Sequence, residues 1–191
     1  ASFNAEMNQL GRRVISFDPL YTLSRHQIES RVAETYRVIV DQCKAKPDDF
    51  IWTYFKDADA LGRHRLAAMR TFLEDFEDGL ADGRYLAGEL PVLDLANNEF
   101  DLALCSHFLF LYSDQLSLDF HITAISEMCR IGGEVRIFPL LALDCRQSPW
   151  VVPVMSEFQR RGFTAEIVKV PYEFQRGGDA MMRITKDRAV T

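Results

Sequence analysis

The sequence predicts an α/β fold, in which a mostly parallel β-sheet carries helices on both faces. Short apolar segments alternate along the chain with longer segments whose apolar residues recur at helical spacing. The segment 100–104 is apolar almost throughout, which is typical of a central parallel strand without a solvent face. Two strand segments, 164–172 and 180–186, close the chain, and the turn residues between them predict an antiparallel hairpin.

Composition narrows the class of protein. The chain has 191 residues, of which 48% are hydrophobic and 26% charged, so a single globular domain spanning 1–191 is expected. Its net charge of −6 argues against a nucleic-acid partner, because phosphate contacts need a basic face. The sequence has no run of about 18 apolar residues, so no membrane partner is expected.

The cysteines and histidines do not indicate a metal site. The cysteines are far apart and form no CxxC pair, and the histidines form no HExxH pattern. No metal ligand is therefore predicted. The wide spacing of the cysteines predicts free thiols in a reducing, cytoplasmic compartment rather than disulfides, and no signal peptide is visible.

The chain opens with the pattern of one α/β unit. Residues 2–10 place their apolar side chains on one helical face, and Gly11 supplies a helix end. Residues 13–17 follow as a buried strand, which Asp18 and Pro19 close.

Two long helices come next. The first is predicted at 23–43, with Ser24 as its N-cap, and the second begins at Asp57 or Asp59 and ends near residue 80. Acidic side chains in the later half of the second helix predict a solvated face rather than a metal site: Glu74, Asp75, Glu77 and Asp78.

The remaining segments alternate between strand and helix patterns. They are a strand at 84–88, the strand at 100–104, a helix from Ser113 or Ser117 to Gly132, a strand at 134–138, a helix at 148–161 and the closing hairpin.

This order resembles the class I S-adenosylmethionine-dependent methyltransferases over nearly the whole chain. The strongest local match is Glu89-Leu90-Pro91 followed by the FDLAL segment at 100–104, which is similar to the "LP…FDLV" block of that family. The pair Gly132-Gly133 before a strand is similar to the family's glycine pair before its fifth strand. The resemblance implies a Rossmann-like fold, S-adenosylmethionine as cofactor and methyl transfer to a small molecule, within a bacterial subgroup of unknown substrate.

The resemblance assigns cofactor contacts by position. Asp18, at the end of the second strand of the family's sheet, would accept hydrogen bonds from the ribose hydroxyls, with Pro19 beside the adenine. Leu86 and Ala87, at the end of the third strand, would also lie near the adenine, although the acid usual there is missing. A turn or cap role for the Asp18 carboxylate stays open.

The end of the 100–104 strand is the expected methyl-transfer face. Cys105 and Ser106 would contact the cofactor there, because ligands of open α/β sheets bind beyond the carboxyl ends of the strands. His107 is the candidate catalytic residue, as a general base, and an orienting or structural role is the alternative.

The stretch at about 22–82 is longer than one α/β unit needs, which is roughly 20 to 25 residues. It is therefore interpreted as a helical lid insertion that shapes the acceptor pocket. Trp52, Tyr54 and Tyr112 are the candidate substrate-binding residues, with core packing as the alternative for the first two.

The family's first strand and its E/D-x-G-x-G-x-G loop are not found in the sequence. Without that loop the chain is expected to bind the cofactor poorly, as a truncated piece of a longer enzyme would. Loss of a central strand would also leave unpaired strand edges, through which self-association is possible. The alternative function is a non-catalytic binding or regulatory module that kept the fold.

Overall fold

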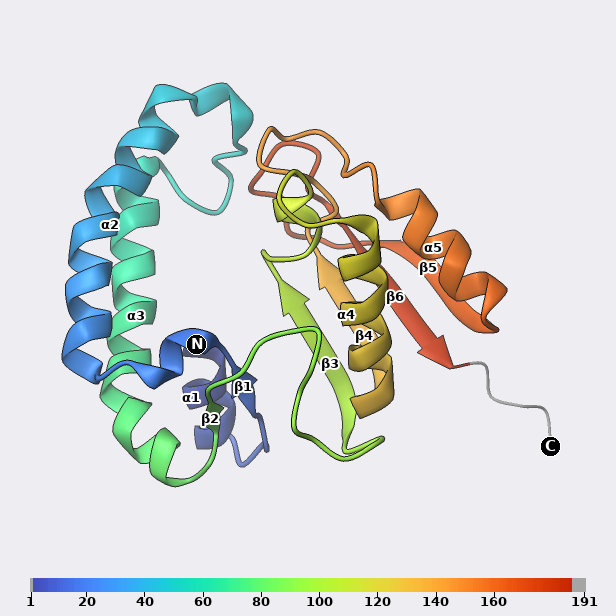
Figure 1. The fold of residues 1–191 in the computed structure, drawn as a ribbon. Helices are drawn as coiled ribbons and strands as arrows, with labels where there is room; N and C mark the ends of the chain where they lie inside the picture. The colour runs from blue at the N-terminus through green and yellow to red at the C-terminus, as the bar shows by residue number, and fades with distance from the viewer. Residues whose placement is uncertain (1, 187–191) are drawn as a thin grey trace. The chain divides into compact units, whose positions relative to one another are not determined.

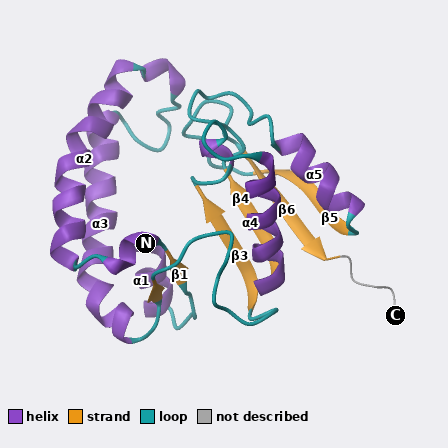
Figure 2. Ribbon diagram, in the orientation of Figure 1, coloured by secondary structure: helices purple, strands orange, loops and turns teal. Residues whose placement is uncertain are grey.

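The computed structural model describes residues 2–186 and divides the chain into two compact units, Ala1–Glu89 and Leu90–Thr191 (Figure 1). Helices and strands occur in both units, so the predicted α/β class is confirmed (Figure 2). That the two units form a single domain stays a prediction. Among the described residues, no helix combines the length and apolarity that a bilayer crossing requires.

The first unit joins a small parallel sheet to a long helix pair. Its elements are α1 (Ser2–Gln9), β1 (Ser16–Phe17), the 3₁₀ turn η1 (Pro19–Thr22), α2 (Arg25–Ala45), η2 (Pro47–Asp49), α3 (Ala58–Ala81) and β2 (Tyr85–Leu86). Strands β1 and β2 are parallel, with Ser16 opposite Tyr85 and Phe17 opposite Leu86. The predicted strand at 13–17 is thus shorter than expected, because only two of its residues pair with β2.

Local side-chain caps explain where the two long helices begin. Ser24 and Gln27 form a reciprocal capping box at the start of α2, with bonds of 2.9 and 3.3 Å. The Asp57 carboxylate accepts a 2.7 Å bond from the Ala60 amide at the start of α3. The predicted helix starts at Ser24 and Asp57 are therefore confirmed.

The core of the first unit lies between the helix pair and β2. Helix α3 contributes Phe72 and Phe76, which are four positions apart and so share one helical face. Their rings contact those of Tyr21 and Tyr85 at centroid distances of 5.3–6.0 Å. Tyr85 is only 1% exposed, so β2 is anchored by a side chain that α3 encloses.

Gly79 is the position of α3 that makes room for Tyr85. A Cβ atom added there would lie 2.2 Å from Cε2 and 2.4 Å from Cδ2 of Tyr85. Alanine normally stabilises a helix relative to glycine by about 1 kcal/mol. Overpacking a core costs about 1–3 kcal/mol, and here the clash involves an enclosed ring.

Gly79→Ala is therefore expected to lower the free energy of unfolding by about 2 kcal/mol despite its better helix propensity. Urea unfolding monitored by circular dichroism measures this. Ala67→Gly, on the exposed surface of the same helix, is the matched control and should cost about 1 kcal/mol. A Gly79→Ala protein that is more stable than the wild type would contradict the enclosed position of Tyr85.

As far as residue 186, the second unit is a mixed sheet with two α-helices. Its elements are β3 (Phe100–Ser106), η3 (Phe110–Tyr112), α4 (Leu118–Ile131), β4 (Gly132–Phe138), α5 (Val151–Arg160), β5 (Phe163–Lys169) and β6 (Ala180–Lys186). The strand order is β3-β4-β6-β5. Strand β3 is parallel to β4, whereas β6 is antiparallel to both β4 and β5, so the predicted closing hairpin is confirmed.

Helices α4 and α5 pack on the same face of this sheet. Their buried residues, including Ile125 and Phe158, form one cluster with strand residues such as Val135 and Ile184. Gly132, expected to end the preceding helix, also opens β4, where an added Cβ would come within 3.1 Å of Ala103 Cβ.

The position of β3 differs from the expectation of a central strand buried on both faces. Within its four-stranded sheet β3 is an edge strand. Cys105 faces the helices, whereas Leu102 and Leu104 point to the other face and are 38% and 52% exposed. The apolar run suggested burial on both sides, but the helices that the structure describes in this unit cover only one.

Candidate functional site

The carboxyl ends of β1 and β2 bring four predicted cofactor residues together in the first unit. Because the strands are parallel, the segments that follow β1 and β2 leave the sheet at the same end. The Asp18 amide donates a hydrogen bond to the Leu86 carbonyl over 3.3 Å, so Asp18 and Pro19 lie beside Leu86 and Ala87. The structure thus brings together the four residues that the family resemblance grouped at one end of the sheet.

The Asp18 carboxylate has a capping role in the structure. One oxygen accepts a 2.9 Å bond from the Leu20 amide, at the N-cap of η1. A carboxylate can accept about four hydrogen bonds, so one cap leaves capacity for a ligand. Its charge also acts on Tyr21, whose pKa is raised to about 12, first by burial and then by Asp18. The cap and a ribose contact are therefore compatible.

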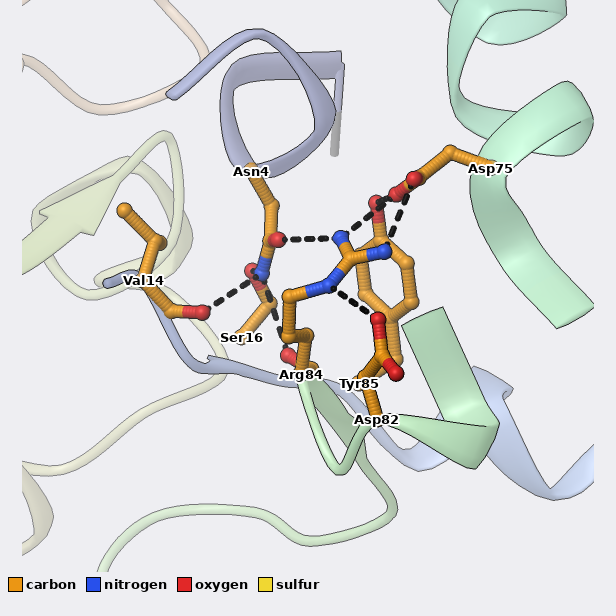
Figure 3. Close-up of polar contacts among 7 residues, drawn as sticks. All are labelled: Asn4, Val14, Ser16, Asp75, Asp82, Arg84 and Tyr85. Carbon is orange, nitrogen blue, oxygen red and sulfur yellow. Dashed lines mark hydrogen bonds and ion pairs between the residues drawn. The ribbon is translucent and has the colours of Figure 1, made fainter. Parts of the chain in front are cut away.

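A buried polar network lies at the opposite, amino end of the same two strands (Figure 3). The Arg84 guanidinium donates two bonds to the Asp75 carboxylate, at 2.7 and 2.8 Å, and the Tyr85 hydroxyl donates a third at 2.7 Å. The Arg84 bonds are the main reason why the pKa of Asp75 lies below its ordinary value of 3.8. Burial, followed by the bond to Asp75, raises the pKa of Tyr85.

Asn4 extends the network to α1. Its side chain is 1% exposed, and its carbonyl oxygen accepts a 3.0 Å bond from Arg84. Its amide nitrogen lies 2.9 Å from Ser16 Oγ and 3.0 Å from the Arg84 carbonyl, within donating distance of both. The network thereby joins α1, β1, α3 and β2, and it supports the strands that position Asp18 and Leu86.

Ser106 and His107 form a hydrogen-bonded pair at the carboxyl end of β3. Ser106 Oγ lies 2.8 Å from His107 Nδ1, and the His107 amide donates to the Phe138 carbonyl over 2.7 Å. His107 has φ = 55°, a left-handed conformation that is uncommon for residues other than glycine. Its exposed ring is therefore held by its backbone and by Ser106 in a defined orientation.

The other residues predicted in the second unit are placed differently. The Cys105 side chain is 8% exposed and belongs to the core, where burial raises its pKa to about 11. Its thiol therefore faces the helices and not the exposed tip that was expected to contact a cofactor. Tyr112 lies in η3, is 39% exposed, and has its ring 6.3 Å from that of Phe108.

Sequence reasoning missed the aromatic residues next to His107. The His107 and Phe138 rings are 5.6 Å apart, and the Phe138 and Tyr172 rings are 6.1 Å apart, both in edge-on arrangements. Phe138 ends β4 and Tyr172 follows β5. The signal available in the sequence was an aromatic residue at the end of each of two predicted strands.

Trp52 and Tyr54 have different surroundings in the first unit. Trp52 lines a pocket of about 320 Å³ together with Lys44, Pro47, Lys56 and four further residues. Its indole nitrogen donates to the Pro47 carbonyl over 3.1 Å, which fixes one side of the ring. Tyr54 is 55% exposed and is not among the residues that line this pocket. Of Trp52 and Tyr54, therefore, only Trp52 lines this pocket.

Comparison with known proteins places the chain in a family without assigning an activity. No family model and no solved structure matches it. MJ0045 of Methanocaldococcus jannaschii, an uncharacterized protein, is 31% identical over 187 residues, which cover 97% of this chain and 81% of the relative. The chain belongs to the same family as MJ0045. Because MJ0045 is itself uncharacterized, the function of this chain has to be inferred from its own residues.

Proposed function

We propose that this protein is an S-adenosylmethionine-dependent methyltransferase of Rossmann-like fold that acts on a small molecule. The observation that carries the proposal is the order and direction of its strands. Doubly wound dinucleotide-binding sheets have the order 3-2-1-4-5-6. The parallel pair β2-β1 corresponds to the 3-2 part of that order, and the parallel pair β3-β4 corresponds to the 4-5 part.

The closing strands add a more specific feature. Strand β6 lies between β4 and β5 and is antiparallel to both. One antiparallel strand among the last two is what the resemblance to class I methyltransferases implies. The strand expected between the two parallel pairs is the family's first strand, which the sequence lacks. Strand β3 is an edge strand of its sheet, so within the described residues its outer backbone groups have no strand partner, and a further parallel strand could pair there.

The residues at the edge of β1 and β2 fit the nucleoside part of S-adenosylmethionine. Asp18 presents a carboxylate with unused acceptor capacity, which suits the two ribose hydroxyls. Pro19, Leu86 and Ala87 offer largely apolar contact for the adenine. When bound, the cofactor supplies a methyl group activated by a sulfonium.

His107 and Ser106 are proposed to act on the acceptor. In this role His107 removes a proton from the acceptor atom as a general base. Ser106 Oγ, 2.8 Å from Nδ1, keeps the ring in one orientation. The rings of Phe138 and Tyr172 extend from His107 and offer apolar contact to an organic acceptor.

Charge supports a small-molecule acceptor. The net charge of −6 disfavours nucleic acids, because phosphate contacts need a basic face.

Calorimetric titration of S-adenosylmethionine tests the proposal. We expect saturable binding that S-adenosylhomocysteine displaces, and weak affinity, since the 191 residues contain no glycine-rich loop. MJ0045, which is longer than the matched region, should be titrated in parallel. The absence of saturable binding in both proteins would contradict the proposal. Binding without methyl transfer to any small molecule offered would favour the non-catalytic module.

A further inference from the structure

A small cationic pocket in the second unit lies outside the site described above. It measures about 180 Å³ and is lined by residues of α4, α5, β5 and β6 and of the turn after α5: Ser126, Cys129, Arg130, Phe158, Arg161, Phe163 and Lys186. Three of these residues are cationic and none carries a carboxylate. Arg130 and Arg161 pair with Glu127 and Glu157, which do not line the pocket, so the lining itself is cationic although the chain has a net charge of −6.

The three cations differ in how their donors are used. Arg130 donates to both oxygens of Glu127, to two main-chain carbonyls of the segment before β3 and to the side-chain oxygen of Asn97, so its N–H groups are occupied. Arg161 donates through Nε to Glu157 and through one terminal nitrogen to Ser126 Oγ. A guanidinium has five donors, so Arg161 keeps donors without a partner among residues 2–186.

Lys186 supplies the second available cation. Its ammonium donates to the side-chain carbonyl of Asn98, a neutral partner, over 2.6 Å. An ammonium has three donors, and within the described part of the chain no carboxylate pairs with this one. Lys186 and Arg161 both lower the pKa of the Cys129 thiol, although burial raises it more, to about 12. The positive charges of Lys186 and Arg161 therefore both influence Cys129, which lines the same pocket.

We propose that this pocket binds a phosphate group. Phosphate offers several acceptor oxygens to the unused donors of Arg161 and Lys186, and charge-assisted bonds are the stronger class of hydrogen bond. The cavity is below the roughly 300 Å³ typical of drug-sized ligands, and a water occupies about 30 Å³. The volume thus suits a phosphate or a small phosphomonoester and not a nucleotide. The Phe158 and Phe163 side chains would contact an attached apolar group.

The experiment titrates inorganic phosphate and, separately, phenyl phosphate into the protein at low ionic strength, with no S-adenosylmethionine present. Saturable binding of phosphate alone identifies free phosphate as the ligand, and tighter binding of phenyl phosphate identifies a phosphomonoester. Both outcomes support the site, and failure of both probes to bind overturns it. Because no cofactor is used, the result is independent of the proposed methyl transfer.

Lys186→Gln is expected to weaken binding about tenfold, and Lys186→Arg should restore it, since arginine also donates to phosphate. Lys169→Gln is the matched control, because Lys169 lies six residues from Phe163 along β5, about 20 Å away. Unchanged binding in Lys186→Gln, or an equal loss in Lys169→Gln, would overturn the proposal. Circular dichroism spectra of the variants verify that they are folded.

Discussion

Replacing Arg84 with methionine should lower the free energy of unfolding by about 3 kcal/mol, because removing one member of a buried ion pair leaves an uncompensated charge. The Arg84 side chain is 10% exposed, and its removal deletes the hydrogen bonds that it donates to Asp75 and to the Asn4 carbonyl oxygen. Methionine fills a similar volume, so the loss reports on the polar network and not on a cavity. Urea unfolding at pH 7 gives the difference directly.

The matched control is Arg160→Met on α5. Arg160 pairs with Glu157, but its side chain is 73% exposed, and exposed ion pairs contribute only about 0–1 kcal/mol. If both variants lose the same stability, the network in Figure 3 does not stabilise the first unit as described.

The pH dependence of unfolding provides a second readout of the same pair. Arg84 lowers the pKa of Asp75 in the folded state, so the folded state favours the charged carboxylate. The resulting stability is present above the ordinary value of 3.8 and is lost as the pH falls through the lower folded pKa. In Asp75→Asn the loss of stability in this acidic range should be smaller than in the wild type.

Asp18→Asn should weaken S-adenosylmethionine binding by about 10- to 100-fold, if the carboxylate holds the ribose as proposed. Hydrogen bonds to charged groups contribute about 1.5–3 kcal/mol, and each 1.4 kcal/mol changes affinity about tenfold. Asparagine caps helices as well as aspartate does, so the bond to the Leu20 amide is kept. The variant therefore separates the charge of Asp18 from its capping role. Isothermal calorimetry measures the affinity.

Asp41→Asn makes the same chemical change on the exposed surface of α2 and should leave the affinity unchanged. An Asp18→Asn protein with wild-type affinity would count against the ribose contact. Equal weakening in both variants would indicate a general effect of net charge.

The helix starts and the closing hairpin could be predicted because the interactions that decide them are local. Ser24, Asp57 and Ser117 each cap a helix through an amide three residues away. The β5–β6 hairpin is similarly determined by two strand patterns on either side of a glycine turn. The grouping of Asp18 with Leu86 followed from the family resemblance, and the two lie together because the parallel strands β1 and β2 end side by side.

Long-range packing could not be read from sequence pattern. Asp75 was expected on a solvated face, yet it binds Arg84, which in turn binds Asn4, 80 positions away. Likewise the pocket lined by Arg161 and Lys186 combines side chains from four elements and one turn, and no spacing rule links Ser126 to Lys186.

The sequence by itself determined the α/β class, the helix caps, the hairpin and the polar tip of β3, because these depend on neighbouring residues and on strand periodicity. Only the tertiary structure decided that β3 is an edge strand of its sheet, that Cys105 points into the core, and that His107 is oriented by Ser106 and Phe138. The physical reason is that a strand's partners, and hence which of its faces is buried, are set by segments distant in the chain.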